Sequence, residues 1–147
     1  MKIEQMKIEY SNLSQSELSL FGCSFPLLSN FSMKVSVNNE IVGFIALEDK
    51  PLILRIDRND TEEVIRYKEG INRRNTFYLR KIMFTPKYEE MLLQALFLKV
   101  NQQMPYNYSI WCKPQIWDRY NYIGKLGGFM RPPFNIRRNI VLFSLNI

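Results

Sequence analysis

Few side chains of this chain could carry acid–base chemistry, because its 147 residues include no histidine. A Ser-His-Asp triad, a Cys-His pair and any histidine-based zinc site are therefore excluded. The two cysteines, Cys23 and Cys112, lack the spacing of metal ligands, and we expect reduced, partly buried thiols and no bound metal. Proton transfer would have to come from Asp, Glu, Tyr, Lys or a chain terminus.

The basic side chains form two groups within a net charge of +6. Residues 66–87 contain seven basic side chains and one acidic one, and residues 104–147 contain six and one. Such surfaces attract the phosphates of nucleic acids or nucleotide cofactors, and also acidic protein surfaces. A basic face that is merely solvated is the alternative interpretation.

The clearest local pattern is a β-hairpin. Residues 33–37 alternate in polarity, Asn38 and Asn39 are turn residues, and 40–47 form a second apolar run. Further predicted strands are Lys7–Tyr10, Leu52–Ile56, Thr76–Thr85, Tyr108–Cys112 and Asn139–Leu145.

Helix signals fall between these strands. Ser14 and Glu17 have the spacing of a capping box, which predicts a helix that ends at Pro26. Pro86 suits the first turn of a second helix that runs to about Gln103 and is apolar nearly all round, so we expect it to be covered on more than one side. Two more helices are predicted over 60–68, stopping at Gly70, and over 114–126, followed by a loop over 129–133.

The chain as a whole reads as one domain over residues 1–147. Its apolar stretches are far shorter than the ~20 residues of a membrane span, and the charged residues 1–4 lack the apolar run of a signal peptide. We therefore expect a protein of the cytoplasm, or of a virion assembled there, with no membrane partner. The counts of 2 Ala, 15 Ile and 13 Asn indicate an AT-rich genome, such as that of a low-GC bacterium or its phage.

Three stretches occur in an order and spacing that is typical of one superfamily. Residues 39–46 read NEIVGFIA, residues 78–88 read YLRKIMFTPKY, and residues 116–129 read IWDRYNYIGKLGGF. In this order they resemble the GCN5-related N-acetyltransferase (GNAT) superfamily. The resemblance implies an α+β, GNAT-like (acyl-CoA N-acyltransferase) fold, whose central mixed, mostly antiparallel sheet is flanked by helices.

The resemblance also implies a site for acetyl-CoA. In that family the backbone of the strand before the coenzyme loop binds the pantetheine, and a glycine-rich loop with a helix N-terminus holds the pyrophosphate. The residues of this chain that match those positions are Ile82, Met83, Phe84, Lys87 and Tyr88.

For catalysis the resemblance implies a base that deprotonates an amine and an acid that protonates the leaving thiolate, commonly a tyrosine of the closing helix. Tyr120 and Tyr122 lie near that tyrosine's position, one to four residues out of register. Glu48 is a candidate base, as is Glu40. Packing roles for the tyrosines and solvent-facing roles for the glutamates are the alternatives.

The sequence departs from the family pattern at the coenzyme loop. Residues 87–93 contain no glycine, and Glu89 and Glu90 stand where a diphosphate would bind. Two carboxylates stabilise a helix N-terminus by about 0.3–1 kcal/mol each, but they repel phosphate.

Three functions remain open at this point. The first is a divergent acetyltransferase that uses acetyl-CoA on an amine. The second is a non-catalytic GNAT-like structural or interaction protein, for instance of a phage virion and part of an oligomer or larger assembly. Its protein partners would bind the apolar helix 91–100 and the aromatic side chains Tyr106, Tyr108, Trp111, Trp117, Tyr120 and Tyr122. The third is nucleic-acid binding by the basic, aromatic C-terminal third.

Overall fold

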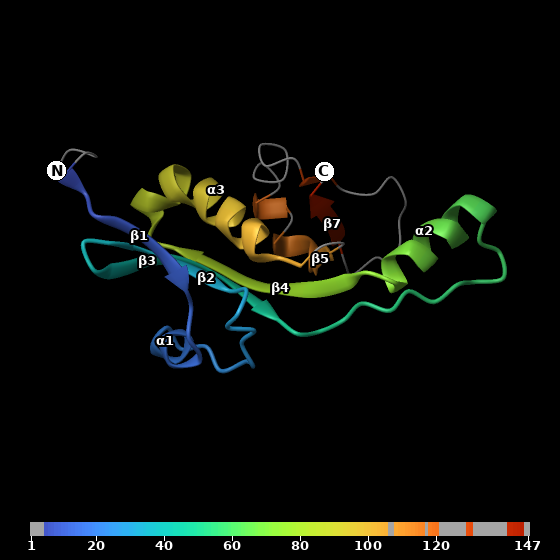
Figure 1. The fold of residues 1–147 in the computed structure, drawn as a ribbon, viewed down its shortest axis with the longest axis horizontal. Coiled ribbons are helices and arrows are strands. Elements are labelled where there is room, and N and C mark those ends of the chain that lie inside the picture. Colours follow the sequence, from blue (N-terminus) through green and yellow to red (C-terminus); the bar gives the residue numbers. More distant parts are fainter. Residues whose placement is uncertain (1–4, 106–107, 117, 121–128, 131–140, 146–147) are drawn as a thin grey trace. The chain divides into compact units, whose positions relative to one another are not determined.

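The structure is a computed structural model that describes residues 5–105, 108–116, 118–120, 129–130 and 141–145 (Figure 1). The chain divides into two compact units. The first unit comprises Met1–Glu48 and Leu79–Met104, and the second comprises Asp49–Tyr78 and Pro105–Ile147. Strand β4 contributes residues to both units. A single domain over residues 1–147 stays a prediction.

The first unit contains four neighbouring strands, in the order β1, β2, β3 and β4. They are β1 (Ile8–Asn12), β2 (Met33–Val37), β3 (Glu40–Glu48) and the C-terminal part of β4 (Asn75–Phe84). The pairs β1–β2 and β2–β3 are antiparallel. The predicted hairpin is confirmed: Asn38 and Asn39 form its turn with φ values of 51° and 70°, which asparagine tolerates better than most residues.

Helix α1 (Gln15–Leu20) begins with the predicted capping box. The Glu17 amide donates to the Ser14 hydroxyl at 3.1 Å, and the Ser14 amide donates to the Glu17 carboxylate at 3.0 Å. The helix ends earlier than expected, because Gly22 adopts a φ of 75° and its amide donates to the Ser19 carbonyl. A left-handed glycine just after the last turn, rather than Pro26, therefore terminates the helix.

Helix α3 (Pro86–Gln103) packs on β2 and β3, and α1 lies on the opposite face of these strands (Figure 1). The helix buries one stripe of side chains: Leu92, Leu93, Leu96, Phe97 and Val100. Met91 is 39% exposed and Leu98 is 37% exposed. Among the described residues the helix is therefore covered along this stripe, and its cover on more than one side stays a prediction.

The second unit contains α2 (Glu62–Asn72), the N-terminal part of β4, β5 (Tyr108–Cys112), β6 (Phe129–Met130) and β7 (Val141–Leu145). Strand β5 pairs with β4 in parallel and with β7 antiparallel, and β6 pairs with β7 antiparallel. The loop predicted over 129–133 is wrong for residues 129 and 130, which form β6. The β4–β5 ladder is parallel, whereas β1–β2, β2–β3, β5–β7 and β6–β7 are antiparallel. The sheet is therefore mixed and mostly antiparallel, and the predicted fold class is confirmed.

The predicted strand over 52–56 is wrong. Leu52 and Leu54 are buried and Ile53 is exposed, as in a strand. Their amides, however, donate to side chains, that of Leu52 to the Thr76 hydroxyl at 2.7 Å and that of Leu54 to the Asn72 amide oxygen at 2.7 Å. The segment is thus extended and half-buried without belonging to a ladder.

Aromatic residues of the second unit form its core. Tyr78 and Trp111 stack with centroids 4.3 Å apart, and they pack with the buried residues Leu52, Leu54 and Ile71. Trp111 and Tyr108 are each only 8% exposed. Their expected contribution to a partner surface is therefore ruled out by burial, and Trp117, Tyr106 and Tyr122 lie outside the described residues. Among the described helices, none is long and apolar enough to cross a membrane.

Candidate functional site

The junction between β4 and α3 is the stretch for which coenzyme contacts are predicted. Strand β4 ends at Phe84, Thr85 is the N-cap residue, and α3 begins with Pro86, so a single residue separates strand from helix. The Thr85 amide donates to the Val42 carbonyl of β3 at 2.8 Å, and the Tyr88 amide donates to the Thr85 carbonyl at 2.9 Å. The junction is therefore anchored to the centre of the first unit.

The ring of Phe84 packs closely against a glycine of β3. A side-chain Cβ on Gly43 of β3 would overlap three ring carbons of Phe84. The absence of a side chain at Gly43 is thus what lets the Phe84 ring lie against β3 at the end of β4.

The side chains of the predicted coenzyme-binding strand are mainly part of the core. Ile82 and Phe84 are 8% and 9% exposed, and Met83 is half-buried against the cluster that contains Leu18 and Phe44. A ligand along this stretch would therefore meet backbone groups rather than these side chains.

The first turn of α3 carries charges of both signs. Lys87 is exposed and its Nζ lies 4.9 Å from the ring centroid of the half-buried Tyr88. Glu89 lies within the first helical turn, and the exposed Glu90 follows it. The helix N-terminus offers backbone N–H groups to an anion, and Glu89 opposes that attraction.

The ladder between β4 and β5 covers only part of β4. It runs from the Asn75–Tyr108 pair to the Tyr78–Trp111 pair, whereas β4 continues for six residues to Phe84. The ladder with β5 thus ends before the stretch Ile82–Phe84.

The predicted catalytic residues belong to different units. Glu48, at the end of β3 in the first unit, is paired with Arg80: the Oε1–Nε distance is 3.7 Å, and the Glu48 side chain is 13% exposed. Tyr120, in the second unit, accepts a hydrogen bond from Arg119 Nε at 3.1 Å, and the guanidinium lies 4.9 Å from its ring centroid. Tyr122 lies outside the described residues. The roles of all three stay predictions.

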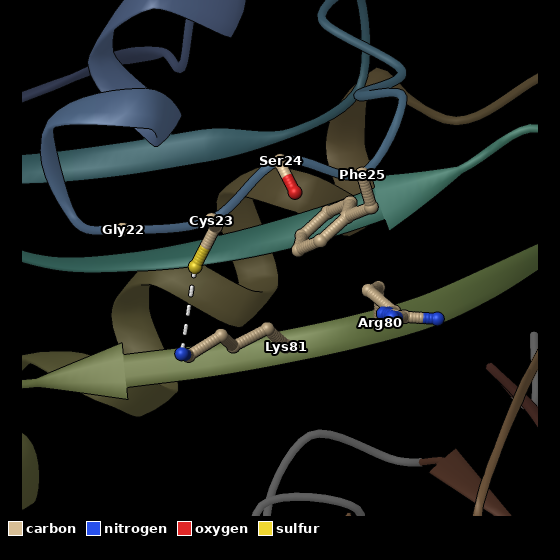
Figure 2. Close-up of a pocket in the computed structure, with 6 residues that line it drawn as sticks. All are labelled: Gly22, Cys23, Ser24, Phe25, Arg80 and Lys81. Carbon is tan, nitrogen blue, oxygen red and sulfur yellow. Dashed lines mark hydrogen bonds between the residues drawn. The ribbon is translucent and has the colours of Figure 1, made fainter.

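A pocket of about 450 Å³ lies beside β4 in the first unit (Figure 2). It is lined by Gly22, Cys23, Ser24, Phe25, Arg80 and Lys81. The segment between α1 and β2 supplies the first four residues, and β4 supplies the two basic ones. Sequence reasoning did not predict this pocket; its one signal was the pair of adjacent basic residues inside an otherwise apolar strand.

No cluster of three or more Cys, Asp or Glu side chains that could hold a metal ion occurs among the residues described. The expectation that no metal is bound stays a prediction.

The sequence matches no protein-family model and no curated protein. The fold, in contrast, is similar to solved acetyltransferase structures. The diaminobutyrate acetyltransferase EctA of Paenibacillus lautus, solved with its substrate and coenzyme A, is 12% identical with a TM-score of 0.53, over 94% of this chain and 93% of that one. Arabidopsis thaliana Naa50, solved with the bisubstrate analogue CoA-Ac-MVNAL, is 14% identical with a TM-score of 0.53, over 95% and 99%.

A GCN5-related N-acetyltransferase from Kribbella flavida is 13% identical with a TM-score of 0.52; the match covers 89% of this chain and 35% of that chain. At these identities the similarity establishes the fold alone. The chain has the GNAT fold, as its motifs predicted.

Proposed function

We propose that this protein is an acetyl-CoA-dependent N-acetyltransferase that acts on an amine. One observation carries the proposal: β4 continues six residues past its ladder with β5 and passes through one residue into the N-terminus of α3. A strand stretch with backbone groups outside that ladder, followed by a helix N-terminus, suits a ligand that has an amide-containing arm and a diphosphate. Two solved proteins of the same fold are described with coenzyme A or a coenzyme A conjugate.

In this proposal, different groups of the chain bind different parts of acetyl-CoA. The backbone of Ile82–Phe84 hydrogen-bonds the pantetheine arm, which fits a stretch whose side chains are turned into the core. The first turn of α3 and the exposed Lys87 attract the diphosphate, while Glu89 weakens that attraction. We therefore expect the coenzyme to be held less tightly than by a glycine-rich loop, whose backbone can approach phosphate closely.

Acetyl-CoA, when bound, supplies a thioester carbonyl that a neutral amine can attack. Glu48 then accepts the proton that the amine loses as its nitrogen bonds to the carbonyl carbon. The bond between carbonyl carbon and sulfur would break, and the leaving thiolate would take up a proton from an acid or from water. Arg80 holds the Glu48 carboxylate in position through their ion pair.

A second candidate is a non-catalytic protein that keeps the GNAT fold for interactions with other proteins. Its support is the junction itself: residues 85–93 contain no glycine, and a carboxylate stands in the first turn of α3. The expected partners and assembly of the chain belong to this candidate.

The experiment is an acetyl-transfer assay that follows release of the coenzyme A thiol with a panel of amines. The native chain should release thiol only when an amine is present. Glu48→Gln should lower kcat by about 10²–10⁴-fold, the usual share of general acid–base catalysis. Glu40→Gln is the matched control, because Glu40 lies on the same strand and is exposed at the hairpin turn.

The variants must keep the native melting temperature for this comparison to count. If the native chain released no thiol with any amine, the enzyme would be rejected in favour of the non-catalytic candidate. Equal kcat values for Glu48→Gln and the native chain would reject Glu48 as the base.

A further inference from the structure

The pocket beside β4 has a chemistry that the proposed function has not used. Its floor carries two adjacent cations, Arg80 and Lys81, and its other wall is the segment Gly22–Phe25 (Figure 2). Both basic side chains belong to exposed residues, whereas their neighbours Leu79 and Ile82 are buried. The pocket's volume of about 450 Å³ lies in the range of small-molecule sites.

Arg80 is held in a defined position. Its guanidinium carbon lies 5.1 Å from the ring centroid of Phe25, and its Nε lies 3.7 Å from Glu48 Oε1. The distance to Glu48 is longer than a hydrogen bond, and a guanidinium has five N–H donors in a planar fork. Arg80 therefore keeps donors for a ligand while Phe25 and Glu48 limit its rotation.

Lys81 is anchored in a similar way. Its Nζ donates to the thiol sulfur of the buried Cys23 at 3.5 Å, as Figure 2 shows. An ammonium group has three donors, so this weak contact leaves others for a ligand. Ser24, whose hydroxyl can also donate, lies in the same pocket wall.

The charge balance favours an anion. Glu48 offsets one of the two cations, and the six lining residues include no carboxylate. Guanidinium and ammonium groups are the usual partners of carboxylate and phosphate oxygens. If Arg80 and Lys81 were merely solvated basic residues, the charge of the pocket would be explained. Their contacts with Phe25 and Cys23 would not be.

We propose that this pocket binds an oxyanion group, a carboxylate or a phosphate, of the amine acceptor. This inference rests on the proposed function and names its substrate class: a small molecule that carries both an amine and an anionic group. Arg80 and Lys81 bind the oxyanion, and Ser24 adds a hydrogen bond.

The position of Arg80 and Lys81 along β4 indicates that the anion belongs to the acceptor rather than to the coenzyme. Lys81 directly precedes Ile82–Phe84, and a strand rises about 3.3 Å per residue, so the two basic residues lie within roughly 10 Å of the proposed pantetheine stretch. The diphosphate is expected at the opposite end of that stretch, at the start of α3.

Matched acceptors test the inference most directly. γ-Aminobutyrate and n-butylamine have the same chain length and differ only in the carboxylate. Phosphoethanolamine and ethanolamine differ only in the phosphate. We expect at least one anionic acceptor to have a kcat/KM about tenfold or more above that of its neutral partner, since charge-assisted hydrogen bonds are the strong ones.

Two variants remove the cations singly. Arg80→Gln and Lys81→Gln should each reduce the preference for the anionic acceptor by about tenfold. Lys81→Gln should act mainly through KM, with less effect on the neutral amine, whereas Arg80→Gln should also lower kcat for both acceptors, because Arg80 holds Glu48 in position. Lys99→Gln is the charge-matched control, because Lys99 lies on α3 of the same unit and does not line the pocket. Its preference should equal that of the native chain.

A binding measurement distinguishes failure of this inference from failure of the proposed acetyltransferase activity. Succinate and inorganic phosphate are titrated into the native chain without coenzyme, and either should bind more weakly to Arg80→Gln and Lys81→Gln. Binding that coenzyme A displaces would overturn the assignment to the acceptor. Acetylation of neutral and anionic amines with equal kcat/KM would overturn it too, while leaving the acetyltransferase intact.

Discussion

At the scale of single residues, Gly43 has no room for a side chain. Gly43→Ala places a methyl group against the Phe84 ring, and such overpacking costs about 1–3 kcal/mol. We expect the free energy of unfolding, measured in urea, to fall by that amount. We also expect acetyl-CoA to bind more weakly, because Phe84 ends the strand that leads into α3.

Gly70→Ala is the control for this prediction. Gly70 lies inside α2 with open space where a Cβ would be, so alanine should stabilise the chain by about 0.5–1 kcal/mol through its helix propensity. A Gly43→Ala variant as stable as the native chain would show that Phe84 does not depend on Gly43.

Tyr67 gives the second residue-scale prediction. Burial raises the pKa of Tyr67 from 10 to about 12, against a smaller lowering by the Arg74 guanidinium. As pH rises, the Tyr67 hydroxyl therefore loses its proton in the unfolded chain before it does so in the folded chain. The contribution of the protonated Tyr67 to folding stability is complete below pH 10 and is lost between pH 10 and about 12. Tyr67→Phe should remove this part of the loss of folding stability at alkaline pH, which is on the order of 2 kcal/mol.

The measurement is the free energy of unfolding of the native chain and of Tyr67→Phe between pH 8 and pH 12. The difference between the two chains should change across that window. If both chains lost stability in parallel, the raised pKa of Tyr67 would be rejected.

Individual residues also show what the sequence could predict. Ser14 with Glu17, and Asn38 with Asn39, act through neighbours in the chain, and all four do what their local chemistry indicates. Arg80 differs, because its surroundings are Phe25 and Glu48, which are far away in sequence. No local pattern could have predicted the pocket that Arg80 shares with Phe25.

At the scale of elements, the first turn of α3 sets the strength of phosphate binding. Glu89→Gln removes a carboxylate from that turn, so acetyl-CoA should bind about two- to fivefold more tightly, while the chain loses about 0.3–1 kcal/mol of stability. Calorimetric titration and urea unfolding measure the two effects.

Glu90→Gln is the matched control, because Glu90 follows the first turn and is exposed. The dipole effect falls off within that turn, so we expect a smaller change in affinity from this substitution. Equal changes for both variants would mean that general charge, and not the helix terminus, governs coenzyme binding.

Two elements differ from the sequence prediction for physical reasons. Helix α2 continues through Gly70 to Asn72, because Ile71 is buried and the Asn72 side chain bonds both the amide and the carbonyl of Leu54. The same two bonds take the place of a ladder for the segment near Leu54. In both cases tertiary contacts override the local preference.

At the scale of the whole molecule, the order of the elements was more informative than any single motif. The hairpin, the strand before Pro86 and the parallel β5 occur in the sequence order that the GNAT resemblance implies. The fold could be predicted because the spacing of apolar residues along the chain reflects the periodicity of the strand or helix that contains them. Activity could not, since it depends on how Glu48 and the start of α3 meet two substrates.

The central claim is that the chain binds acetyl-CoA at the end of β4 and the start of α3. The most direct test is a calorimetric titration of acetyl-CoA into the native chain, with a Glu89→Gly/Glu90→Gly variant beside it. We predict one site with a micromolar or lower Kd for the native chain, and tighter binding for the variant. Binding that only the variant shows, or that neither chain shows, would contradict the claim and favour the non-catalytic role.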